Sequence, residues 1–228
     1  DYAYALDILD QYDYHKLEYE SEKTTFEAKG IVRTTDGKEI NIDISLKMQR
    51  ELFNYERINV RAGDAVFIDP LVINFDGTSA DLTSKKIEFD LTANGKKELI
   101  SYLKPGSGFL AIDRNNDGII NDGTELFGPQ TGNGFKELSK YDSDSNGWID
   151  KNDKIFDSLK ILTFDENGNQ RLFSLIDKDI GAIYLGNIDT KFDLLDSYNN
   201  LNGQVQKSGI YLNNNGTPGI IQHIDLTA

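Results

Sequence analysis

Ile-Asn-Ile-Asp-Ile-Ser-Leu-Lys-Met at residues 40–48 alternates apolar and polar side chains at every position. Such alternation is typical of a strand with one buried face, because successive side chains of a strand point to opposite sides. A second segment in which apolar and polar residues alternate, Phe26 to Val32, precedes it, and Asp36-Gly37 between them favours a tight turn. The stretch predicts a β-hairpin. Residues 1–23, rich in tyrosine and charge, are expected to form a lead-in segment.

Short apolar runs separated by turn residues continue along the chain, which is typical of a β-rich domain. We expect an α+β, mainly β fold of antiparallel hairpins, with a single domain over 24–228 and a small helical calcium-binding insert at about 109–160. Residues 49–68 fit either a strand or a short helix. The expected strands are 71–75, 87–91, 99–103, 109–112, 183–185, 192–195, 204–212 and 220–226, and the expected short helices are 135–141 and 155–159.

Two stretches of that insert share one arrangement of oxygen-bearing side chains: Asp-Arg-Asn-Asn-Asp-Gly-Ile-Ile at 113–120 and Asp-Ser-Asp-Ser-Asn-Gly-Trp-Ile at 142–149. Ca²⁺ prefers about six to eight oxygen ligands, and an EF-hand loop supplies them from alternate side chains, a carbonyl and a final acid. Glycine at the sixth position permits the sharp turn. The pattern predicts paired EF-hand-like loops holding two Ca²⁺ ions, and the alternative is a pair of metal-free turns.

The two loops differ at their ends. In the second loop, Asp153 stands at the twelfth position, whereas the first has Thr124 there, and we expect Glu125 rather than Asp122 to close it. If the loops pair side by side, the backbones of Ile120 and Ile149 should hydrogen-bond to each other. The expected ligands are Asp113, Asn115, Asp117, Ile119 (carbonyl), Asn121 and Glu125 in the first loop, and Asp142, Asp144, Asn146, Trp148 (carbonyl), Asp150 and Asp153 in the second.

Weaker versions of the pattern occur at 90–95 and 165–169. In the first, Thr92 and Lys96 dilute the negative charge, and a hairpin turn is the favoured interpretation. In the second, Gln170 stands where glycine is needed.

The composition excludes several function classes. With 38 acidic and 24 basic residues the formal charge is −14, which disfavours nucleic-acid partners and anionic membrane surfaces. The chain has no cysteine, so disulfides and cysteine-based zinc sites are excluded. No apolar run is long enough for membrane insertion. The chain starts at Asp1 without methionine, so we expect a piece of a longer protein.

Several motifs resemble a known bacterial family: Asp-Pro-Leu-Val-Ile-Asn-Phe-Asp-Gly at 69–77, Glu-Leu-Phe-Gly at 125–128 and Gly-Ala-Ile-Tyr-Leu-Gly at 181–186. The chain is similar to the calcium-binding modules with a "DPLVxDxDGD…ELFG" pattern, found in uncharacterised proteins and in RTX- or VCBS-type secreted proteins. The resemblance covers nearly the whole chain and implies calcium binding and secretion. One related branch, the self-processing module of iron-regulated RTX proteins, cuts its own Asp-Pro bond, which here would be Asp69-Pro70.

The leading hypothesis is a calcium-stabilised module of an exported or surface protein without conventional catalysis. The alternatives are calcium-dependent self-processing at Asp69-Pro70 and a calcium-regulated sensor. The two histidines, His15 and His223, are expected to be surface or structural residues. Glycoside hydrolysis stays open, because it needs only two carboxylates brought together by folding. The sequence identifies no protein or glycan partner.

Overall fold

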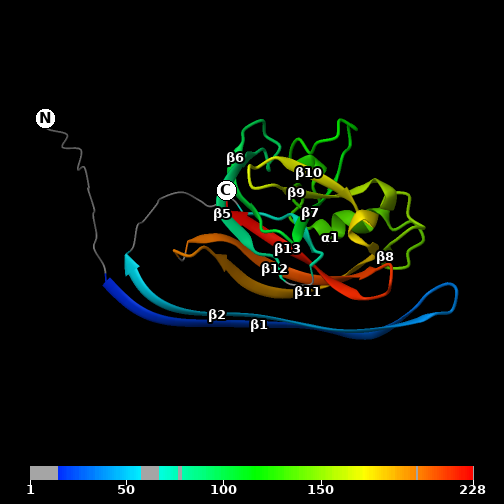
Figure 1. Cartoon of the computed structure of the whole chain (residues 1–228), viewed down its shortest axis with the longest axis horizontal. Helices are drawn as coiled ribbons and strands as arrows, with labels where there is room; N and C mark the ends of the chain where they lie inside the picture. The colour runs from blue at the N-terminus through cyan, green and yellow to red at the C-terminus, as the bar shows by residue number, and fades with distance from the viewer. Residues whose placement is uncertain (1–14, 58–66, 77–78, 199, 228) are drawn as a thin grey trace, which may run out of the picture.

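The computed structural model describes residues 15–57, 67–76, 79–198 and 200–227. Within these residues, nine strands form one sheet in the order β10-β9-β7-β4-β13-β12-β11-β8, with β3 also paired to β13. Two separate hairpins, β1–β2 and β5–β6, complete the β structure (Figure 1). The mainly β, antiparallel fold expected from the sequence is confirmed. Among the described residues, no helix has the length and apolar character needed to cross a membrane.

The strands are β1 (His15–Arg33), β2 (Glu39–Arg57), β3 (Phe67–Ile68), β4 (Leu71–Asn74), β5 (Leu82–Phe89), β6 (Glu98–Leu103), β7 (Ser107–Ile112), β8 (Trp148–Ile149), β9 (Leu159–Phe164), β10 (Gln170–Ser174), β11 (Ile180–Leu195), β12 (Leu201–Asn213) and β13 (Pro218–Thr227). The helical elements are α1 (Gly134–Leu138) and the 3₁₀ turns η1 (Gly123–Glu125), η2 (Ser139–Tyr141), η3 (Phe156–Ser158) and η4 (Ile176–Lys178).

The central sheet is covered on both faces, as the alternation of β4 illustrates. Val72 packs into a hydrophobic cluster with the hairpins β1–β2 and β5–β6, whereas Leu71 and Ile73 pack into a second cluster that includes Phe135 of α1. Figure 1 shows the β1–β2 hairpin running along one side of β11, β12 and β13. All four residues of β4 are buried, so the strand has buried side chains on both faces. Such strands need apolar side chains in succession, and Leu71, Val72 and Ile73 supply them.

The hairpin predicted from residues 26–48 is present and longer than expected. Strand β1 already begins at His15, within the expected lead-in, and β2 continues to Arg57, so residues 49–57 are strand. At the connecting turn the Gly37 amide donates to the Thr34 carbonyl at 2.9 Å. The remainder of the ambiguous segment, 58–66, and lead-in residues 1–14 lie outside the described part of the chain.

The helical insert is smaller than expected. The predicted helix at 135–141 is present as α1 followed by η2, whereas the predicted helix at 155–159 is a single 3₁₀ turn, η3. The first calcium-type loop begins at the end of β7 and ends in η1, so it lies between a strand and a 3₁₀ turn. Unlike an EF-hand, it therefore lacks flanking α-helices.

Gln222 of β13 is fully buried between the sheet and the β1–β2 hairpin, where a polar side chain must be fully hydrogen-bonded. Its Oε1 accepts from Asn74 Nδ2 at 2.8 Å, from the Ala80 amide at 2.9 Å and from Ser79 Oγ at 3.2 Å. Its Nε2 donates to Ser208 Oγ at 3.3 Å. One side chain thus ties β4, β12, β13 and the segment before β5 together.

Replacing Gln222 with leucine should lower the free energy of unfolding by about 2–4 kcal/mol, because the Asn74 amide and the Ala80 N–H lose their buried acceptor. Urea-induced unfolding measures the effect. The control is Gln49→Leu at an exposed position of β2, which should change stability by less than about 0.5 kcal/mol. Equal stabilities for the two variants would contradict this role of Gln222.

Candidate functional site

Both calcium-type loops have the same local backbone, built around their first aspartate. The carboxylate of Asp113 accepts from the amides of Asp117 at 3.2 Å and Gly118 at 2.9 Å. In the second loop, Asp142 accepts from the amides of Asn146 at 3.2 Å and Gly147 at 2.9 Å. These hydrogen bonds wrap each loop around its first carboxylate.

Glu125 closes the first loop. It is 4% exposed, and its two carboxylate oxygens accept from the amides of Arg114 at 2.9 Å and Asn121 at 2.8 Å. Asp122, the alternative closing acid, instead caps η1 by accepting from the Thr124 amide at 2.8 Å. The longer side chain of glutamate thus reaches back across the loop, as expected, whereas its ligation of calcium stays a prediction.

Asp153 has the corresponding place in the second loop. It is 2% exposed and accepts from the amides of Ser143 at 2.7 Å and Asp150 at 3.0 Å. Burial raises the pKa of Asp153, but the hydrogen bonds from Ser143 and Asp150 together outweigh burial and hold the pKa below its usual value. Carboxylate oxygens of Asp142, Asp144 and Asp153 lie within 4.8 Å of one another. This is a donor set of hard oxygens that fits Ca²⁺.

The predicted backbone pairing of Ile120 with Ile149 is wrong. The amide and carbonyl of Ile120 are hydrogen-bonded to the side chain of Gln170, at 2.8 and 2.7 Å, and Ile149 pairs with Ile183 of β11. The two isoleucines belong to different hydrophobic clusters. Because the loops are attached to different strands of the sheet, each is held by its own partner and they do not form an EF-hand pair.

The segment at 90–95, which has a weaker version of the pattern, lies in the connection between β5 and β6. This agrees with its interpretation as a hairpin turn. Asp90 accepts from the amides of Asn94 at 3.0 Å and Gly95 at 2.8 Å, which repeats the bonding of Asp113 and Asp142. The segment at 165–169 likewise forms the turn between β9 and β10, with Asp165 accepting from the Asn169 amide at 3.0 Å.

The Asp69-Pro70 bond lies between β3 and β4, against the run at 125–128 that follows the first loop. The Leu71 amide donates to the Phe127 carbonyl at 2.8 Å, and the Ile224 amide donates to the Pro70 carbonyl at 3.1 Å. A Cβ atom added to Gly128 would lie 1.8 Å from the Asp69 carbonyl oxygen, so only glycine fits here. The glycine of the Glu-Leu-Phe-Gly motif thus packs directly on the carbonyl of the bond.

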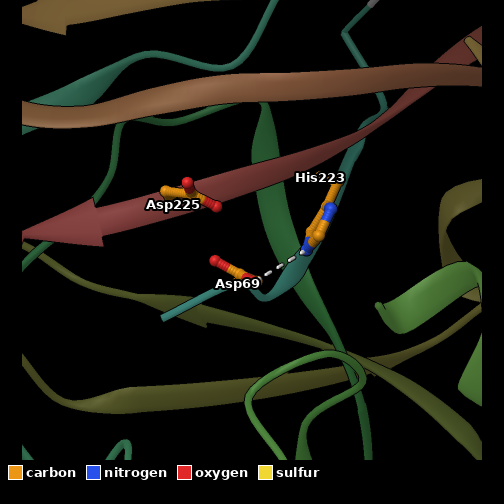
Figure 2. A group of neighbouring side chains, drawn as sticks. All are labelled: Asp69, His223 and Asp225. Carbon is orange, nitrogen blue, oxygen red and sulfur yellow. Dashed lines mark ion pairs between the residues drawn. The ribbon is translucent and has the colours of Figure 1, made fainter. Parts of the chain in front are cut away.

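Two residues of β13, His223 and Asp225, lie beside the Asp69 side chain (Figure 2). Ligand atoms of the three residues lie within 4.8 Å of one another, and His223 Nε2 is 3.9 Å from Asp69 Oδ2. Burial and the neighbouring carboxyl of Asp225 raise the pKa of Asp69 to about 8. Burial lowers the pKa of His223, against the charge of Asp225. At neutral pH, Asp69 therefore keeps its proton and His223 is neutral.

The sequence interpretation identified the Asp69-Pro70 bond but did not include His223 and Asp225 in a site. His223 is buried, at 3% exposed, but its ring nitrogens have no hydrogen-bond partner among the described residues, so it is not the satisfied structural histidine that was expected. The available signal was the spacing of the two residues, because positions two apart on one strand face the same side of the sheet. The spacing does not indicate that the segment between β3 and β4, which contains Asp69, lies beside these two residues.

Comparison with known proteins places these features in a family context. A model of the SPM domain family matches residues 71–227, which is well over half of the chain and begins directly after Pro70. The iron-regulated protein FrpA of Neisseria meningitidis serogroup C is 28% identical over 113 residues, which cover 44% of this chain and 10% of that protein. The chain thus matches a small part of that much longer relative.

Gly128→Ala should destabilise the fold more than the same change at Gly37, although both glycines have positive φ, +120° and +84°. At Gly37 nothing lies within 4 Å of the added Cβ, so only backbone strain of about 1–2 kcal/mol is expected. At Gly128 the free energy of unfolding should fall by a further 1–3 kcal/mol or so, about the cost of overpacking, because the added Cβ collides with the Asp69 carbonyl. Urea unfolding of both variants measures the difference, and equal losses would refute the close packing.

Proposed function

The chain belongs to the SPM domain family, and from that premise we propose that it is a calcium-binding, calcium-stabilised module of an exported or surface bacterial protein of the RTX type. The observation that carries the proposal is the second loop. There, carboxylate oxygens of Asp142, Asp144 and Asp153 converge within 4.8 Å while Asp153 is buried. The family model and the similarity to FrpA support the wider context.

Electrostatics gives the reason for calcium dependence. Like charges at this separation repel each other, and the repulsion is strongest where a carboxylate is shielded from water, as Asp153 is. A bound divalent cation replaces that repulsion by attraction and offsets part of the formal charge of −14. At a calcium concentration about a hundred times Kd, each site would stabilise the fold by about 2.7 kcal/mol. Folding would therefore be favoured in a calcium-rich external medium.

Calcium at the first loop would also act on the Asp69-Pro70 bond. Glu125 ends the loop, and Gly128, three positions later, packs on the carbonyl of that bond. The Gly128 amide is in turn held by Glu137 of α1 at 2.9 Å. Ordering of the first loop by a cation would thus fix the position of Gly128 and, through it, of the Asp69 carbonyl.

Calcium should raise the melting temperature of the protein relative to a chelator, and calorimetric titration should give two sites. Asp142→Ala should remove one of them, because it deletes both a ligand and the acceptor of two backbone amides. The matched control is Asp157→Ala, an exposed aspartate outside the loops, which should keep both sites. A melting temperature that is the same in chelator and in millimolar calcium would contradict the proposal.

A second candidate function is calcium-dependent self-cleavage at Asp69-Pro70. The observation that favours it is the position of the Asp69 side chain, which is only 20% exposed and lies beside Asp225. A carboxyl that keeps its proton at neutral pH contains both an attacking oxygen and the proton that the leaving proline nitrogen needs. The side chain of Asp69 could therefore supply both the attacking oxygen and the proton for the Pro70 nitrogen.

The reaction would proceed by cyclisation. A carboxyl oxygen of Asp69 attacks the Asp69 carbonyl carbon, the bond from that carbon to the Pro70 nitrogen breaks, and the carboxyl proton passes to that nitrogen, directly or through Asp225. The product is a cyclic anhydride at Asp69 and a free amine at Pro70, and water then opens the anhydride. The contribution of the fold is to hold the carbonyl against Gly128 while the side chain approaches it.

Incubation with calcium should yield two fragments, 1–69 and 70–228, seen by mass spectrometry of the denatured protein. Asp69→Ala should abolish cleavage, whereas Asp157→Ala should cleave at the normal rate. Because the proton comes from a carboxyl whose pKa is raised to about 8, the rate should fall as the pH rises above about 8. Fragments that form equally fast in chelator would exclude calcium control, and an intact chain after prolonged incubation would exclude self-cleavage.

A further inference from the structure

We propose that Asp69, His223 and Asp225 form a third metal site, which takes a divalent transition ion of the zinc type rather than Ca²⁺. An ion bound there would hold the Asp69 carboxyl and so keep the Asp69-Pro70 bond uncut. The binding of the ion follows from the geometry of the three side chains alone. Only the inhibition of cleavage rests on the self-cleavage proposed above.

The principal observation is the imidazole of His223. The residue is 3% exposed, and neither of its ring nitrogens has a hydrogen-bond partner within the described part of the chain. A buried polar atom without a partner costs about 1–3 kcal/mol, so such an atom calls for a ligand or another compensating contact. Figure 2 shows the ring edge directed toward Asp69.

The distances suit a shared ion better than direct contacts. His223 Nε2 lies 3.9 Å from Asp69 Oδ2, which is too long for a hydrogen bond. Two ligands of one tetrahedral zinc ion, each about 2.0–2.2 Å from the metal, lie roughly 3.3–3.6 Å apart. A movement of a few tenths of an ångström would therefore bring these two atoms to ligand distance.

Asp225 completes the set of ligands from the same strand. Its Oδ1 is buried and, apart from the carboxyl of Asp69, has no partner among the residues described, whereas its Oδ2 accepts from Gln206 Nε2. The hydrogen bond from Gln206 orients the carboxylate and leaves the other oxygen free, as is common for carboxylate ligands of metals. The Asp69 side chain, 20% exposed, offers the ion a route to solvent.

The types of ligand select the ion. A neutral imidazole and two carboxylates give three protein ligands, and together with one water they match the tetrahedral coordination of zinc. Ca²⁺ prefers about six to eight oxygens, which the loops at 113–125 and 142–153 supply better. The imidazole of His223 is also buried, so a bound ion there would be shielded from water.

Metal binding and cleavage would exclude each other. Once an Asp69 oxygen is bound to the ion and the carboxyl proton has been displaced, the group can neither attack its own carbonyl nor protonate the Pro70 nitrogen. The two kinds of cation would thus have opposite effects. Calcium at the loops would order the bond for cleavage, whereas a zinc-type ion at the bond would keep it intact.

The direct test uses Co²⁺, because its visible absorption reports ligand type and coordination geometry. In saturating calcium, the full chain carrying Asp69 should bind one Co²⁺ ion with an absorption spectrum typical of four-coordinate nitrogen and oxygen ligands, and Zn²⁺ should displace it. His223→Gln and Asp225→Asn should each lose this spectrum, while His15→Gln, which alters the chain's other histidine, should retain it. The calcium-dependent melting temperature shows whether each variant is folded.

Failure of the wild-type chain to show this spectrum would overturn the proposal. So would a spectrum that is unchanged in both folded variants, because the ion would then lie elsewhere.

The second arm measures cleavage in calcium with and without Zn²⁺. At a zinc concentration about a hundred times Kd, only about 1% of the molecules would be metal-free, so fragments should form about 100-fold more slowly. Zinc that binds with no effect on the rate would overturn the inhibitory role. If no fragments form under any condition, self-cleavage fails, and the Co²⁺ spectrum still decides whether the site exists.

Discussion

The central position of β13 is the constraint on which the rest of the structure depends. This strand pairs with β12 on one side and with β3 and β4 on the other, and most of its side chains are buried. A polar residue there needs a specific partner. The side chain of Gln222 has five partners on one face, whereas His223 on the opposite face has none among the described residues. The difference separates a structural polar residue from one available for chemistry.

The two loops have different mechanical positions in the fold. The second contains Trp148 and Ile149 of the edge strand β8, which pairs with β11, so an ion there would stabilise the edge of the sheet. The first leads through Glu125 to Gly128 and so to the Asp69 carbonyl. Under the proposed calcium binding, one kind of loop would act on stability at the edge of the sheet and on the Asp69-Pro70 bond near its centre.

Features governed by nearby residues could be predicted from the sequence. The alternation at 40–48 identified the hairpin. The side chain of Glu125 reaches back across the first loop, while its choice over Asp122 as a calcium ligand stays a prediction. Features governed by sheet order could not be predicted. No local pattern places β13 beside β4, so the approach of His223 and Asp225 to Asp69 was missed. The pairing of Ile120 with Ile149 failed similarly, because the side chain of Gln170, distant in sequence, binds Ile120 instead.

The β1–β2 hairpin would hold the two pieces of the chain together after a break at residue 69. It precedes Asp69, yet Phe26, Ile42, Leu46 and Met48 lie in the same hydrophobic cluster as Val205 and Ile224 of the central sheet. The two pieces left by a break at residue 69 would stay together as a non-covalent complex, much like complementing protein fragments. Such a break would create a new carboxyl terminus without releasing it, and separation would require a force or a partner that peels the hairpin away.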